Sequence, residues 1–243
     1  MHWIPPRRTG SELLDQGAGT LDDVRASLND MWRLNRVTGG LDAFMRLLVP
    51  RLAAPGTAAL HVADLGAGSG RLAGYVRAWA CRRGKPMRVY ALDLSARNLK
   101  IAQEIAQRGY ATHTTAPPLA LIQADALALP FAPSAIDYYI STLILHHFEP
   151  DALIALLRHT FERAGRGIVM SDITRGALAH IGFRAVQPFA GPHPITRHDG
   201  LVSLRRAYTP DELRAFAHAA GLAGARVIVH PLWRMTLIAD KTQ

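Results

Sequence analysis

Three glycines, Gly66, Gly68 and Gly70, have the spacing of a turn that binds a nucleotide-like ligand. They follow an apolar stretch containing Asp64, and a helical pattern begins directly after them. A glycine turn between a strand and a helix lets the backbone approach a ligand closely, because no Cβ atom is in the way. The first N–H groups of the helix are then free to bind a negatively charged group. This segment therefore predicts a ligand site at the carboxyl end of a strand.

The glycine spacing differs from that of dinucleotide-binding proteins. Their pattern has two residues between the second and third glycines, whereas one residue separates Gly68 from Gly70. Arg71 stands where the dinucleotide pattern requires glycine or alanine. The sequence also contains no Tyr-x-x-x-Lys pair. An NAD-dependent oxidoreductase is therefore disfavoured.

Two aspartates end the next two predicted strands. An acidic residue about 20 positions beyond the glycines can accept hydrogen bonds from both ribose hydroxyls, and Asp93 fits this position. Its other reading, a helix cap, is already filled by Ser95. Asp125 could accept from an adenine amino group, or it could be an exposed turn aspartate. With their neighbours Leu94 and Ala126, these carboxylates predict that the ligand contains adenosine.

The D-x-G-x-G-x-G form of residues 64–70 resembles motif I of class I methyltransferases. The likeness is specific to the methyltransferase type 11 group, which includes ubiquinone and menaquinone C-methyltransferases. Asp125, the run 129–131 (Leu-Pro-Phe) and Asp137 match that group's pattern, with Ile136 in place of its usual Phe. The resemblance implies S-adenosyl-L-methionine as the cofactor. It also implies an α/β, Rossmann-like doubly wound sheet of seven strands with the last antiparallel.

The resemblance extends beyond the glycine region. The stretch STLILHHFEP, which begins at Ser141, is similar to the group's fourth strand end, and Ser141 joins the cofactor-binding candidates. Asn35-Arg36 with Gly39-Gly40, and the loop 196–200, resemble small bacterial methyltransferases that accompany polyketide synthases. The implied reaction is methyl transfer to a small, largely apolar acceptor, with O-methylation of a phenol, quinol or polyketide expected first. Carbon methylation of a quinone-like ring is the alternative, and RNA methylation is less favoured.

Histidines are the candidate bases, because their pKa lies near neutral pH. His198 is expected to approach the hydroxyl of the acceptor, with Asp199 orienting it, although Asp199 could instead stabilise a turn. His147 follows the predicted fourth strand and is the second candidate, with a structural role as its alternative. No metal is expected, because no pair of potential ligands shows i,i+4 spacing on a helix.

The elements that must position these residues follow an alternating strand–helix pattern, which predicts a parallel sheet with helices on both faces. We expect one methyltransferase domain. Residues 1–57 form a helical N-terminal lid and 58–172 the cofactor-binding core. Residues 173–208 form a lid insertion, with a helix over 175–189 and then a polar loop. Residues 209–243 form a helix and a hairpin, and the helix is expected to begin with a capping box of Thr209 and Glu212. Both lids are expected to close over the acceptor.

Composition limits the other possibilities. The net charge of +9 comes from 28 basic residues, of which only three are lysines, and they are scattered along the chain. This distribution favours a solvated basic surface over a nucleic-acid partner. The single cysteine, Cys81, excludes a disulfide within the chain. The absence of a signal peptide or a long apolar segment predicts a cytoplasmic protein with no membrane partner. We expect a monomer or a homodimer.

Overall fold

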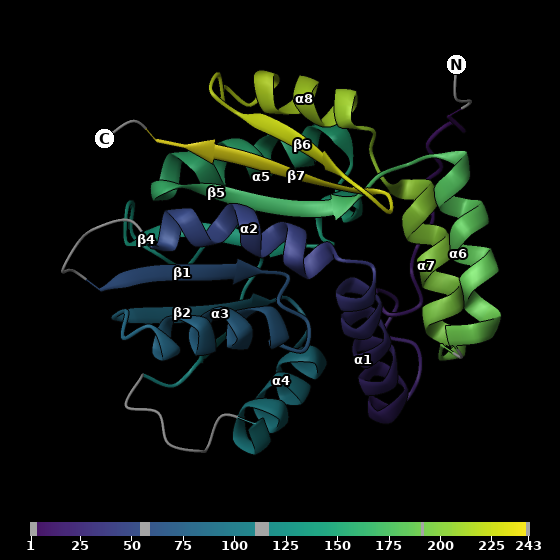
Figure 1. Ribbon diagram of the computed structural model, residues 1–243, viewed down its shortest axis with the longest axis horizontal. Coiled ribbons are helices and arrows are strands. Elements are labelled where there is room, and N and C mark those ends of the chain that lie inside the picture. Colours follow the sequence, from purple (N-terminus) through teal and green to yellow (C-terminus); the bar gives the residue numbers. More distant parts are fainter. Residues whose placement is uncertain (1–3, 54–58, 110–116, 191, 242–243) are drawn as a thin grey trace.

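The computed structural model describes residues 4–53, 59–109, 117–190 and 192–241 (Figure 1). The boundary predicted between residues 57 and 58 lies outside these ranges. No helix in the described residues is both long and apolar enough to cross a membrane.

A seven-stranded sheet forms the centre, with the order β3-β2-β1-β4-β5-β7-β6. β1 to β5 are parallel, and β7 is antiparallel to both of its neighbours, as the family resemblance implied. The predicted strands are all present: β1 (Leu60–Leu65), β2 (Met87–Asp93), β3 (Ala120–Gln123), β4 (Ile136–Thr142), β5 (Ala164–Ile173), β6 (Arg226–His230) and β7 (Arg234–Asp240). Because β1 to β4 are parallel and adjacent, their carboxyl ends meet at one edge of the sheet.

Helices cover both faces of this sheet through separate apolar clusters. On one face pack α2 (Gly40–Leu52) and α3 (Arg71–Arg82), and on the other α5 (Pro150–Arg163) and α8 (Pro210–Ala219). Residues of β1 alternate between the two clusters, Val62 facing the first and Ala63 the second, as the two-residue repeat of a strand requires. The capping box predicted for α8 is present, with Thr209 and Glu212 bonding each other's backbone N–H groups.

The remaining helices stand at the carboxyl ends of the parallel strands. Figure 1 shows α1, α6 and α7 grouped beyond the arrowheads of the parallel strands β1, β2 and β5. Their bounds, with those of α4 and of a short 3₁₀ helix η1, are α1 (Leu21–Val37), α4 (Ala96–Gly109), η1 (Leu145–His147), α6 (Ala177–Ala190) and α7 (Pro194–Arg206). This group closes the edge at which the predicted ligand residues end.

The prediction of a loop after α6 was wrong, because α7 occupies residues 194–206. His193 caps this helix, its side chain accepting from the N–H of Ile195, and Pro194 supplies a favourable first position. The helix buries Thr196 and Asp199 among its apolar residues. Polar residues on the buried side remove the apolar periodicity by which a helix is recognised in a sequence.

Candidate active site

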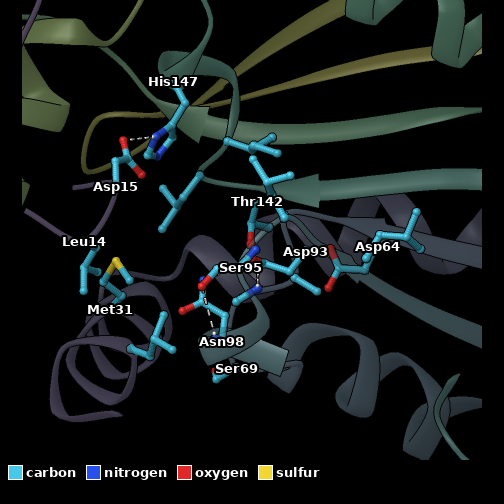
Figure 2. A pocket seen from close by; sticks show the side chains of 18 of the residues that line it. Leu14, Asp15, Met31, Asp64, Ser69, Asp93, Ser95, Asn98, Thr142 and His147 are labelled. Atoms are coloured by element: carbon cyan, nitrogen blue, oxygen red, sulfur yellow. Dashed lines mark hydrogen bonds and ion pairs between the residues drawn. The ribbon is translucent and has the colours of Figure 1, made fainter. Parts of the chain in front are cut away.

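A cavity of about 620 Å³ lies where β1 to β4 end (Figure 2). The strand ends supply glycines and carboxylates to it. The opposite wall consists of the N-terminal segment and α1: Glu12, Leu14, Asp15, Gly17, Val24, Leu28, Met31, Trp32 and Asn35. The cavity therefore has a polar end over the glycine turn and an apolar wall opposite.

The glycine turn follows β1 and forms the floor of the polar end. Gly66 and Gly68 line the cavity with φ of +64° and +53°, values that side chains rarely allow. A Cβ on Gly66 would lie 2.5 Å from Cδ1 of Ile144. Gly70 is the N-cap of α3 and does not line the cavity. The turn thus leaves the backbone bare toward a ligand, as the spacing predicted.

Asp64 is buried at this end of the cavity and one of its carboxylate oxygens has no partner. Burial raises its pKa well above the usual range, although the N–H of Ala73 lowers it and the nearby Asp93 raises it further. An unpartnered buried carboxylate is costly unless a donor or cation binds it. The atom therefore fits a cationic group of a ligand.

Asp93 is held by three donors. Its Oδ2 accepts from Gly68 N at 2.7 Å, and its Oδ1 accepts from Ser95 N at 2.9 Å and from the Asn98 side-chain amide at 3.1 Å. Burial raises its pKa, and these three hydrogen bonds lower it. A carboxylate accepts about four hydrogen bonds, so one position remains for a ligand. Asn98, which also lines the cavity, can offer the second contact.

The other predicted cofactor residues occupy different places. Leu94, Asp125 and Ala126 line the cavity. Asp125 is exposed and accepts from Leu127 N at 2.9 Å, so the turn role weighed for it is present too. Ser141 is fully buried and is not one of the lining residues, whereas the next residue, Thr142, is.

A second polar group meets the cavity beyond Ile144. His147 Nδ1 lies 3.0 Å from Asp15 Oδ2, and Figure 2 shows this pair apart from the Asp64 and Asp93 carboxylates. Glu12, from the same N-terminal segment as Asp15, also lines the cavity. Burial raises the pKa of the Glu12 and Asp15 carboxyls. The His147 and His146 imidazoles act in the opposite direction, and the pKa of each carboxyl lies below its ordinary value.

His146 lies behind this group and is buried against Asp172. Its Nδ1 is 2.8 Å from Asp172 Oδ1, and its backbone N–H donates to Asp172 Oδ2 at 3.0 Å. Burial lowers the pKa of the imidazole, but the Asp172 and Glu12 carboxylates outweigh it and raise the pKa to about 9. His146 therefore supports a charged network and does not line the cavity.

Residues 62–167 match the family model described as a methyltransferase domain. The matched residues run from β1 into β5 and include the glycine turn, so this part of the chain is similar to a methyltransferase domain. No curated protein matches the chain by sequence.

Solved methyltransferase structures share the fold of this chain across most of its length. Magnesium protoporphyrin IX methyltransferase from Synechocystis PCC 6803, solved with S-adenosylhomocysteine (SAH), is 18% identical with a TM-score of 0.59, over 97% of this chain and 90% of that one. The plantazolicin methyltransferase BpumL, solved with a substrate analogue and SAH, is 12% identical with a TM-score of 0.66, over 91% of each chain. At 12–18% identity, the likeness to these structures shows that the chain has their fold.

The structure does not bring the predicted base His198 to the cavity. Its imidazole lies on α7, is 47% exposed, and is not among the lining residues. Asp199 does hold it, with 2.8 Å between His198 Nδ1 and Asp199 Oδ1. Yet the same carboxylate also accepts from the N–H groups of Leu13 and Leu14. This geometry gives Asp199 an anchoring position and favours His147 as the histidine near the acceptor.

Sequence reasoning missed four polar residues of the site: Glu12, Asp15, Asn98 and Asp172. Asp172 lies near the end of β5 and could have been found by the rule that located Asp93 and Asp125. Asn98 lies within one helical turn of Ser95. Glu12 and Asp15 belong to an irregular segment, and nothing in the local pattern indicates that it folds against α7 and η1.

Proposed function

We propose that the protein transfers a methyl group from S-adenosylmethionine to an oxygen of a small, largely apolar acceptor, such as a phenol, quinol or polyketide. The observation that carries this proposal is the single cavity with two different ends. One end joins the bare glycine turn to the Asp64 and Asp93 carboxylates, and the other joins apolar α1 side chains to the His147–Asp15 pair.

The cofactor end provides complementary groups for each part of S-adenosylmethionine. We assign the unpartnered Asp64 oxygen to the cationic amino-acid portion, because a buried carboxylate gains most from a cation. Asp93 and Asn98 would share the ribose hydroxyls, and the exposed Leu94 with Asp125 and Ala126 would border the adenine. When bound, the cofactor supplies a methyl group carried on a positively charged sulfur.

The acceptor end supplies an apolar wall and a few polar groups. Val24, Leu28 and Met31 of α1 and Leu14 of the N-terminal segment would contact the body of the acceptor. The His147–Asp15 pair and Glu12 would hold its hydroxyl and draw off its proton. Because displacement at carbon requires close alignment of both reactants, the main work of the protein is positioning.

The proposal keeps the covering segments predicted from the sequence. The N-terminal residues would close over the acceptor, and the 173–208 insertion, which has no residue among those that line the cavity, would act by holding them. Residues 12–17 and α1 form the wall opposite the sheet. α7, from the insertion, packs against α1 and, through Asp199, holds the N-terminal segment. Two structural neighbours, the magnesium protoporphyrin IX methyltransferase and the plantazolicin methyltransferase, agree with a small-molecule acceptor.

The test is direct assay of methyl transfer. The purified protein would be incubated with methyl-labelled S-adenosylmethionine and a panel of phenols, hydroquinones and alkylresorcinols, and the products identified by mass spectrometry and NMR. We expect label in a methoxy group. Label on ring carbon would establish carbon methylation instead, and label in transfer or ribosomal RNA with none in the panel would overturn the small-molecule assignment.

A further inference from the structure

Two neighbouring imidazoles at the acceptor end have the same arrangement. His146 Nδ1 lies 2.8 Å from Asp172 Oδ1, and His147 Nδ1 lies 3.0 Å from Asp15 Oδ2. A carboxylate on Nδ1 holds a proton there, so Nε2 is the nitrogen that can give up its proton and bind a cation. Metal-binding histidines almost always have this partner on the other ring nitrogen.

Both Nε2 atoms face the carboxylate of Glu12. His146 Nε2 lies 3.4 Å from Glu12 Oε1, and His147 Nε2 lies 3.8 Å from Glu12 Oε2. Hydrogen bonds between charged groups are typically about 2.7–2.9 Å long, so both ion pairs are longer than a tight charged hydrogen bond. Three ligand atoms, one from each residue, lie within 4.8 Å of one another.

We propose that Glu12, His146 and His147 bind a divalent transition-metal cation of the zinc type. Zinc binds imidazole nitrogen and carboxylate oxygen at about 2.0–2.2 Å, which places tetrahedral ligands roughly 3.3 Å apart. The 3.4 Å separation, from His146 Nε2 to Glu12 Oε1, is close to that value. The 3.8 Å separation joins His147 Nε2 to the other oxygen, Oε2, so the His147 side chain has to shift for the cation to bind both imidazoles and one carboxylate oxygen. Two imidazoles and one carboxylate favour zinc or ferrous iron over magnesium or calcium.

The groups behind the three ligands are already held in place. Ser203 Oγ donates to Glu12 Oε1 at 2.6 Å, and the N–H of Ile173 donates to Asp172 Oδ1 at 2.7 Å. The Arg206 guanidinium donates to the backbone carbonyls of both histidines, at 3.1 and 2.7 Å. The ligand set is therefore oriented before any cation binds, which reduces the cost of assembling the site.

Charge at the cluster also favours a cation. Glu12, Asp15 and Asp172 bring three carboxylates to the two imidazoles, and Glu12 and His146 are only 4% and 2% exposed. Arg206 lies beside them, with Nη1 3.6 Å from Asp15 Oδ2. A dication would balance the remaining two negative charges and replace the protons that the imidazoles otherwise carry.

The cluster has one side open to the cavity, because Glu12 and His147 line it. Three protein ligands with a free fourth position is the arrangement of catalytic zinc sites. Resting on the proposed function, an acceptor oxygen would occupy that position. With the cation bound, its proton would pass to water and not to His147 or Glu12, whose ligand atoms the cation then occupies. The lone pair of the acceptor oxygen then forms the bond to the methyl carbon as the carbon–sulfur bond breaks, leaving a neutral thioether.

The experiment measures metal binding without any acceptor. Chelator-treated protein would be titrated with Co²⁺, followed by its visible absorption, and with Zn²⁺ alone by calorimetry. We expect one equivalent to bind, with Glu12→Gln and His147→Gln each lowering the affinity at least tenfold. Asp15→Asn, which keeps its size but weakens the support of His147, should lower it about 10-fold to 100-fold. His218→Gln, at an exposed histidine on α8, is the matched control and should bind like the wild type.

Binding of SAH to each variant shows whether it is folded and separates the two proposals. Metal binding that is absent in the wild type, or equal in the wild type and Glu12→Gln, overturns the cation site and leaves the proposed function standing. One bound Zn²⁺ with no affinity for the cofactor product would support the cation site and overturn the proposed function. If Glu12→Gln loses the cofactor as well, His147→Gln and Asp15→Asn decide, and wild-type Zn²⁺ affinity in both overturns the site.

Discussion

The carboxylate of Asp199 accepts a hydrogen bond from the backbone N–H of Leu13 at 2.8 Å, and so joins α7 to the N-terminal segment. Its other oxygen accepts from the next N–H, that of Leu14, at 3.1 Å. Glu12 and Asp15, which flank these two residues, line the cavity. A buried carboxylate in the insertion therefore sets the position of the polar groups that face the acceptor.

Replacement of Asp199 by Ala should release residues 12–17 from α7. Two partly buried N–H groups would lose their acceptor, at a cost of about 1–3 kcal/mol each in the free energy of unfolding. We expect a several-fold rise in the KM of the acceptor, unchanged SAH affinity, and faster hydrogen exchange at residues 13 and 14. His198→Ala, which keeps the anchor, serves as the control and should leave exchange and turnover near wild type. A larger loss of turnover in His198→Ala than in Asp199→Ala would return the base role to His198.

Gly66→Ala should weaken cofactor binding by two separable effects. A non-glycine residue at φ +64° costs about 1–2 kcal/mol, and its Cβ would lie 2.5 Å from Ile144 Cδ1. Adding Ile144→Ala should relieve the second effect and restore part of the SAH affinity measured by calorimetry. Gly84→Ala is the matched control, since Gly84 has φ +60° with no atom within 4 Å of its Cβ position. That variant should lose stability but keep its affinity for SAH.

How far the sequence could predict this architecture depended on whether the signals were local. The strands, the glycine turn and the α8 capping box depend on neighbouring residues, and all were predicted. The antiparallel position of β7 came from the family resemblance. α7 was missed because it buries Thr196 and Asp199 along with apolar residues, so its pattern is not amphipathic.

The same distinction between local and non-local signals applies to the residues of the site. Asp64, Asp93 and Asp125 were found because carboxyl ends of parallel strands meet at one edge, and all three line the cavity. His198 was singled out from its motif, but the direction in which α7 presents it depends on packing against α1 and α6. Glu12 was not singled out, because only the tertiary fold brings the N-terminal segment to His146.

Asn98→Ala tests how the ribose would be held. Asn98 occupies one of the about four positions at which Asp93 accepts hydrogen bonds. If Asn98 contacts the second hydroxyl, its removal should weaken SAH binding about tenfold, the effect of one lost hydrogen bond. The loss should disappear with a deoxy analogue that lacks that hydroxyl. Equal losses for both ligands would show that Asn98 only orients Asp93.

Asp64→Asn should have opposite effects on the empty protein and on the complex. Burial raises the pKa of Asp64, so ionising this group in the folded state opposes folding. The stability linked to its neutral form is fully present below the ordinary value of 3.8 and is lost as pH rises toward the folded pKa. In urea unfolding of the empty protein, the free-energy difference between variant and wild type should therefore move in favour of the Asn variant from about pH 4 to pH 7.

SAH affinity of Asp64→Asn at pH 7 should fall about tenfold to a hundredfold, since a bond to a charged group contributes about 1.5–3 kcal/mol. At a pH below the folded pKa of Asp64, the wild type should release protons when it binds SAH, and Asp64→Asn should release fewer. Calorimetry in buffers of different ionisation enthalpy measures this release. A pH-independent stability difference together with unchanged affinity would mean that Asp64 neither bears the burial cost nor contacts the cofactor.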